Sequence, residues 1–235
     1  TEIEKEKLSG EKKRLKAFIS YSTLDKITGA EVKDILARFG IEGFLAHNDI
    51  HVSEEWKQRI VDELSKTDIF IPLLSNNFKN SDWAPQELGI AYVRDILIIP
   101  LTLDETIPFG FIDHIQGKAY PDNENILLNY LIKPIIDEFP EYMIPKVIEE
   151  LDKAYNFRYA ESVMELLVPY FGQFGQEDID KFVDFSIKNS QVWDAIKCKQ
   201  EYIPEFITIH KDKIAADKLK ILSYQIEKGK SYAEA

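Results

Sequence analysis

Cysteine is almost absent from this sequence, with Cys198 the only one among 235 residues. A single cysteine excludes a disulfide within the chain and a zinc site built from cysteines. Such sparing use of cysteine is typical of proteins in a reducing compartment. We therefore expect a cytoplasmic protein.

Long hydrophobic runs and an excess of basic residues are also lacking. No apolar stretch approaches the roughly 18 residues that a transmembrane helix needs, and the N-terminal segment is too highly charged for a signal peptide. The chain has 29 Lys and Arg against 41 Asp and Glu, a net charge of −12. We expect neither a membrane nor a nucleic acid as a partner, since both would favour a basic surface.

The first half of the chain alternates strand-like and helical segments after a charged lead-in over residues 1–14. An apolar content of 45% is typical of a globular protein. Helical spacing of apolar residues lies between short apolar runs, which predicts a parallel sheet covered on both faces. The predicted strands are residues 15–21, 42–46, 68–74, 96–101 and 115–120.

After about residue 122 the strand-like runs stop and helical periodicity continues to the C-terminus. One stripe of apolar residues comprises Ile144, Val147, Ile148 and Leu151, which are three or four positions apart. Prolines and glycines separate the predicted helices. We therefore predict an α/β domain over residues 15–125, followed by an all-α region over residues 126–235 that acts as a sensor, in oligomerisation or in regulation.

One stretch, Ser81–Tyr92, carries the strongest functional signal. Asp82 can cap a helix and Pro85 suits its first turn. Trp83 and Glu87 then lie one turn apart on one face. Most glutamates are solvated, but the loops that follow parallel strands share one sheet edge, where ligands of such sheets bind. The position of its helix at this edge makes Glu87 a candidate catalytic residue.

Four segments in order resemble the TIR (Toll/interleukin-1 receptor) domain family, in particular its prokaryotic members. Ala17–Ser22 (AFISYS), followed by Asp25, resembles the first conserved box of the family. GFLAHNDI from Gly43 resembles the second strand and the start of the BB loop, and DIFIPLLS from Asp68 matches the third strand. SDWAPQELGIA from Ser81 resembles the Trp-x-x-x-Glu helix of TIR domains that cleave NAD.

The resemblance implies a flavodoxin-like TIR domain with a five-stranded parallel sheet. It also implies that Glu87 is the catalytic residue of an NAD+ glycohydrolase or cyclase, with Trp83 as the aromatic residue one turn earlier. The products would be nicotinamide and either ADP-ribose or a cyclic ADP-ribose isomer. In the family this activity serves prokaryotic (anti-phage) immunity and requires self-association through the TIR domain and its BB loop.

No cofactor is expected, because the sequence has neither a Gly-x-Gly-x-x-Gly motif nor a P-loop, and NAD would be the substrate. The substrate-binding candidates also have structural interpretations: Trp83 could close the edge of the sheet, Trp56 could pack in the core, and Asp49 could hold its loop by an Asx-turn. We expect no metal site, since no convergent ligand from elsewhere in the chain accompanies His47, Asp49 and His51. The substrate-binding candidates are Ser20, Tyr21, Ser22, Ala46, His47, Asp49, Trp56, Ser75 and Trp83.

Two other functions remain open from the sequence. The chain could be a non-catalytic TIR adaptor that acts through protein–protein interaction, although its BB loop lacks the Pro-Gly tip of receptor-type adaptors. The third possibility is transfer of a ribosyl group onto a base. A regulatory protein or ligand could bind the helical region in any of these cases.

Overall fold

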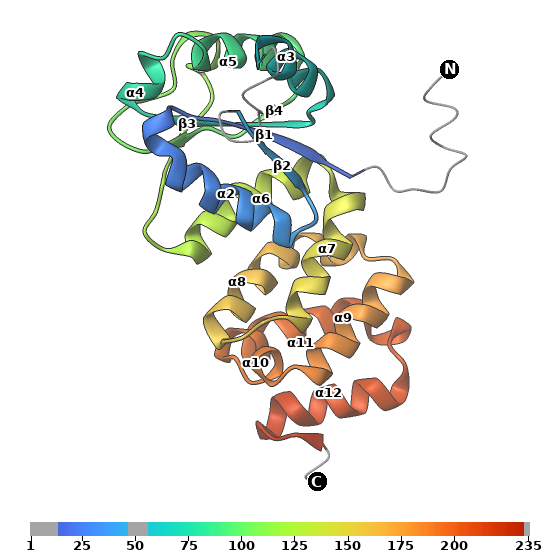
Figure 1. Ribbon diagram of the computed structural model, residues 1–235. Helices are drawn as coiled ribbons and strands as arrows, with labels where there is room; N and C mark the ends of the chain where they lie inside the picture. Colours follow the sequence, from blue (N-terminus) through green and yellow to red (C-terminus); the bar gives the residue numbers. More distant parts are fainter. Residues whose placement is uncertain (1–13, 47–55, 233–235) are drawn as a thin grey trace, which may run out of the picture. The chain divides into compact units, whose positions relative to one another are not determined.

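The computed structural model describes residues 14–46 and 56–232. The chain divides into two compact units between Tyr120 and Pro121. The first unit contains a parallel sheet with helices, and the second contains only helices (Figure 1). The expected boundary after residue 125 falls in the first turn of the helix that begins the second unit.

The sheet is parallel throughout and has the order β2-β1-β3-β5-β6, with β4 also paired to β3. When β4 and β5 are counted as one interrupted strand, this is the flavodoxin-like order 2-1-3-4-5. The strands are β1 Lys16–Ser20, β2 Glu42–Leu45, β3 Ile69–Leu74, β4 Leu97–Ile98, β5 Leu101–Thr102 and β6 Lys118–Ala119.

The expected continuous strand over residues 96–101 is wrong in one respect, because it is broken between β4 and β5. Pro100 lies in the break and has no N–H to donate to a ladder. The backbone carbonyl of Pro100 still accepts a hydrogen bond from the Lys118 amide, 3.0 Å away. β3 pairs with β4 before the proline and with β5 after it.

Helices cover both faces of the sheet. In Figure 1, α3, α4 and α5 lie on one face, and α2 lies on the other. The short helix α4 was not expected from the sequence; the Ser75 hydroxyl caps it by accepting the Phe78 amide at 3.0 Å. The helical elements of this unit are η1 Thr23–Asp25, α2 Lys26–Arg38, α3 Trp56–Lys66, α4 Asn76–Lys79, α5 Ala84–Val93 and η2 Gly110–Ile112.

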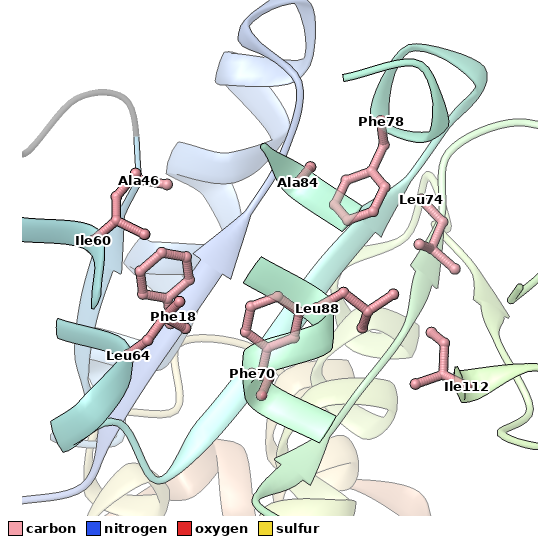
Figure 2. Close-up of a cluster of buried hydrophobic side chains, with 11 residues drawn as sticks. Phe18, Ala46, Ile60, Leu64, Phe70, Leu74, Phe78, Ala84, Leu88 and Ile112 are labelled. Atoms are coloured by element: carbon pink, nitrogen blue, oxygen red, sulfur yellow. The ribbon is translucent and has the colours of Figure 1, made fainter. Parts of the chain in front are cut away.

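The core beneath α3, α4 and α5 is built from alternate residues of the central strands. Phe18 of β1 and Phe70 of β3 have ring centroids 5.8 Å apart and are stacked. Leu64 of α3 and Leu88 of α5 belong to the same buried cluster (Figure 2). Because side chains two residues apart share a face of a strand, Ser20 lies on the same face as Phe18. This face is therefore the one that α5 covers.

The second unit packs its helices around aromatic rings. Phe206 of α11 stacks on Phe182 of α9 with ring centroids 3.9 Å apart, and Phe171 and Phe174 complete the cluster. Its elements are α6 Glu124–Glu138, α7 Pro140–Asp152, α8 Phe157–Leu167, η3 Val168–Gln173, α9 Gln176–Lys188, α10 Ser190–Trp193, the π-helical turn η4 Cys198–Tyr202, α11 Ile203–His210, η5 Lys211–Lys213 and α12 Ala216–Lys228. None of the helices in the described chain is both long and apolar enough to span a bilayer.

Candidate active site

Glu87 occupies a position on α5 where an apolar residue is normal. The buried residues of this helix are Ala84, Glu87, Leu88 and Ala91, which form one stripe at helical spacing toward the sheet. The Glu87 side chain is only 2% exposed. A carboxylate buried among apolar neighbours is costly unless its oxygens are paired. Glu87 is therefore not the solvated glutamate that its residue type alone would suggest.

One oxygen of this carboxylate is paired and the other is not. The Ser20 hydroxyl donates a hydrogen bond to Oε2 of Glu87 over 2.5 Å. Oε1 is also buried, and none of the described residues donates a hydrogen bond to it. A buried polar atom of this kind needs an explanation, and a catalytic role is one of those that apply to a carboxylate.

Burial changes the ionisation of Glu87. Loss of solvation raises its pKa from 4.5 to about 7, and the Ser20 hydrogen bond acts in the opposite direction. Both protonation states are therefore well populated at neutral pH. A carboxyl group whose pKa lies near the working pH is typical of active sites.

The start of α5 differs from the sequence prediction. Trp83, rather than Asp82, is the N-cap residue, and its carbonyl accepts the Glu87 amide at 3.0 Å. The hydroxyl that satisfies the first amides belongs to Ser81, which accepts from Trp83 and Ala84 at 3.3 and 3.4 Å. Trp83 still precedes Glu87 by one turn, but it lies at the helix entrance rather than inside the helix.

The structure brings Trp83 and Trp56 together. Their ring centroids are 4.2 Å apart with an edge-to-face angle of 73°, and the Lys57 ammonium lies 5.2 Å from the Trp83 ring centroid. Trp56 is 36% exposed, so it is not the core residue that was the alternative for it. A partly exposed aromatic pair beside a cation can stack on a nucleobase or pyridine ring.

The other candidates within the described chain are distributed between core and edge. Tyr21 is 1% exposed, and its ring lies against Gly29 of α2, so it is not an open stacking surface. Ala46 belongs to the apolar cluster beneath α3. Ser75 uses its hydroxyl to donate to Asp25 over 2.8 Å and to cap α4. Ser22 is partly exposed at the start of η1.

Two predicted substrate-binding residues, His47 and Asp49, lie outside the described residues, as does His51. Within residues 14–46 and 56–232, no three His, Cys, Asp or Glu side chains gather as metal ligands would. The Asp25–Ser75 contact, which links the segments after β1 and β3, was missed from the sequence. Its only sequence signal is the placement of both residues just after strand ends.

The family model for the TIR domain matches residues 17–126. Residues 17–126 form a TIR domain. The match extends from β1, which ends at Ser20, into the beginning of α6, and it includes α5 with Glu87. It thus contains both residues of the buried Ser20–Glu87 hydrogen bond.

Among solved structures, the TIR domain of the Toll-related receptor TRR-2 from Hydra magnipapillata aligns with this chain at 18% sequence identity. The TM-score is 0.43, and the alignment covers 54% of this chain and 96% of that chain. The comparison with curated proteins gives no match.

Proposed function

We propose that the TIR domain of this protein cleaves the nicotinamide–ribose bond of NAD+, with Glu87 as the catalytic residue. The observation that carries the proposal is the buried Glu87 carboxylate, which has one oxygen without a described partner and a pKa of about 7. The TIR family contains NAD-cleaving enzymes as well as adaptors. The two lines of support are independent, because the first comes from the geometry and the second from the family.

The chemistry requires little beyond this carboxylate. Glycosidases need a second carboxyl group to protonate an alcohol leaving group, but nicotinamide leaves NAD+ as a neutral base. What remains is an oxocarbenium-like transition state, which a fixed negative group stabilises. The ionised form of Glu87 supplies that charge, and Oε1 is available to accept a hydrogen bond from a ribose hydroxyl.

Access to Glu87 must involve movement. A side chain that is 2% exposed does not meet a dinucleotide until neighbouring atoms move apart. Many enzymes complete their sites by such gating steps. TIR domains self-associate and interact with other proteins, and we infer that self-assembly opens this site. The helical unit, Pro121–Ala235, would sense the trigger or promote that assembly, in a role suited to prokaryotic immunity.

In this proposal Trp56 and Trp83 bind the rings of NAD+. Stacking of a base on an aromatic side chain contributes about 1–3 kcal/mol. We expect Trp56→Ala to raise the KM for NAD+ by about tenfold and to change kcat little, because ring stacking is the same in the ground and transition states. Steady-state kinetics measures both constants.

The control for this substitution is Phe111→Ala, since Phe111 is an exposed aromatic residue on η2 (63%). We expect Phe111→Ala to leave the KM unchanged. An unchanged KM in Trp56→Ala as well would remove the Trp pair from the substrate site.

The test of the proposed function is nicotinamide release from NAD+ by concentrated protein, with Glu87→Gln as the matched variant and chromatographic separation of the products. Nicotinamide release by the wild type but not by Glu87→Gln supports the proposal. Chromatography of the second product shows whether it is ADP-ribose or a cyclic isomer. No release from concentrated, assembled wild type would contradict it. The closed Glu87 site would then fit the adaptor function, in which this carboxylate is structural.

A further inference from the structure

Ser20 is the last residue of β1, a strand with neighbours on both sides. It pairs with Pro72 of β3 and is fully buried. Its hydroxyl lies on the face covered by α5 and reaches Oε2 of Glu87 over 2.5 Å, although the two residues are 67 positions apart. Such a short O–H···O contact is typical of a hydrogen bond to a carboxylate.

A serine hydroxyl has one proton to donate, and Ser20 donates it to Glu87. The same hydroxyl cannot simultaneously donate to a ribose or phosphate oxygen. Ser75, the other buried serine among the substrate-binding candidates, likewise donates to a protein carboxylate, that of Asp25. The structure thus gives Ser20 a role toward the catalytic residue instead of toward the substrate.

We propose that Ser20 is a positioning residue, whose hydroxyl fixes Oε2 of Glu87 so that Oε1 alone faces the substrate, and which favours the ionised form of the carboxylate. This proposal rests on the proposed function for its catalytic consequence. Its geometric part depends only on the structure: Oε2 of Glu87 is hydrogen-bonded to Ser20 of β1, and Oε1 has no donor among the described residues.

The ionisation of Glu87 depends on Ser20 because little else opposes the effect of burial. Burial and the Ser20 hydrogen bond are the two causes of its pKa shift. Charged groups on the neighbouring elements have other partners. On α3, Lys57 lies over the Trp83 ring and Arg59 pairs with Glu63. Lys79 of α4 lies over the Phe109 ring. Asp25 accepts a hydrogen bond from Ser75, and Arg94 donates to backbone carbonyls at the end of α3.

The first test is the pH dependence of NAD+ cleavage by Ser20→Ala and Ser20→Thr. Loss of the hydroxyl should move the acid limb of the activity profile up by about one pH unit. Activity of Ser20→Ala would then fall about fivefold at pH 7 and return close to the wild-type level at pH 9, where Glu87 ionises without help. Ser20→Thr keeps a hydroxyl, so the acid limb of its activity profile should lie at the same pH as in the wild type.

The matched control is Ser186→Ala, which removes a buried hydroxyl from α9 in the helical unit. This variant should show the same pH dependence of NAD+ cleavage as the wild type. A Ser20→Ala loss that is equal at all pH values would overturn the proposal, since a hydroxyl that contacts ribose or only supports the fold would act in that way.

The second test does not need enzyme activity. The Glu87 side chain is titrated by carbon NMR in protein labelled at the glutamate carboxyl, and its signal is assigned by its absence in Glu87→Gln. We expect the titration midpoint to rise by about one pH unit in Ser20→Ala and not in Ser186→Ala. An unchanged midpoint would refute the positioning role. A shifted midpoint in a protein without NAD+ cleavage would refute the proposed function alone.

Discussion

Glu87→Gln should lower the rate of NAD+ cleavage by about 10²- to 10³-fold, the usual effect of removing one preorganised electrostatic group from an active site. Glutamine has the shape of glutamate, and its amide oxygen can still accept the Ser20 hydroxyl, so the geometry of α5 and β1 should be retained. What the variant loses is the negative charge that we propose stabilises the transition state at the ribose. The measurement is nicotinamide release under saturating NAD+, at equal protein concentration.

Two controls accompany this comparison. The assembly state of Glu87→Gln must match that of the wild type, because we propose that assembly opens the site. Its circular dichroism must also match, which shows that the α/β fold is intact. A well-folded, normally assembled Glu87→Gln with the wild-type rate would exclude Glu87 as the catalytic residue.

The same substitution should stabilise the protein above pH 7. Glu87 has a pKa of 4.5 when solvated and about 7 in the folded protein, because it is buried. Between these values the unfolded chain is ionised at this residue while the folded protein keeps its proton. The free energy of unfolding therefore falls as the pH rises from about 4.5 to 7, by roughly 3 kcal/mol in total. Glutamine does not ionise, so Glu87→Gln should not show this decrease in the free energy of unfolding.

Chemical denaturation at a series of pH values measures this effect as the difference between variant and wild type. We expect Glu87→Gln to gain stability progressively up to pH 7 and to keep a constant advantage of at most roughly 3 kcal/mol above it. Glu105→Gln, in an exposed loop, is the matched control and should show no such trend. A stability difference that is the same at pH 5 and pH 8 would contradict the assignment.

Taken together, the two results would describe a trade-off between activity and stability. The ionised carboxylate that the proposed reaction needs is the form that the folded protein tolerates least, because Glu87 lies on the buried stripe of α5. Active sites commonly retain such destabilising groups. The Ser20 hydrogen bond reduces the cost, since it favours the charged form.

Local order was largely predictable from the sequence. The ends of β1, β2 and β3, the parallel arrangement and the change to an all-helical region follow from periodicity and from turn residues, which act over a few positions. Pro100 could also have indicated the break between β4 and β5. The TIR segments placed Glu87 on a helix at the edge where the strands end, and that was sufficient to name it as a candidate.

The environment of Glu87 was decided only by the tertiary structure. Its spacing from Leu88 and Ala91 is compatible with either face of a helix, and the sequence alone predicts only that its helix begins at the sheet edge where ligands bind. Packing of α5 on the sheet instead buries the carboxylate and brings it to Ser20, 67 positions away. A hydrogen bond over such a distance depends on strand order and helix rotation together. The sequence therefore determined that Glu87 is the candidate residue, and the fold determined which of its oxygens is paired, which residue pairs with it, and that burial raises its pKa.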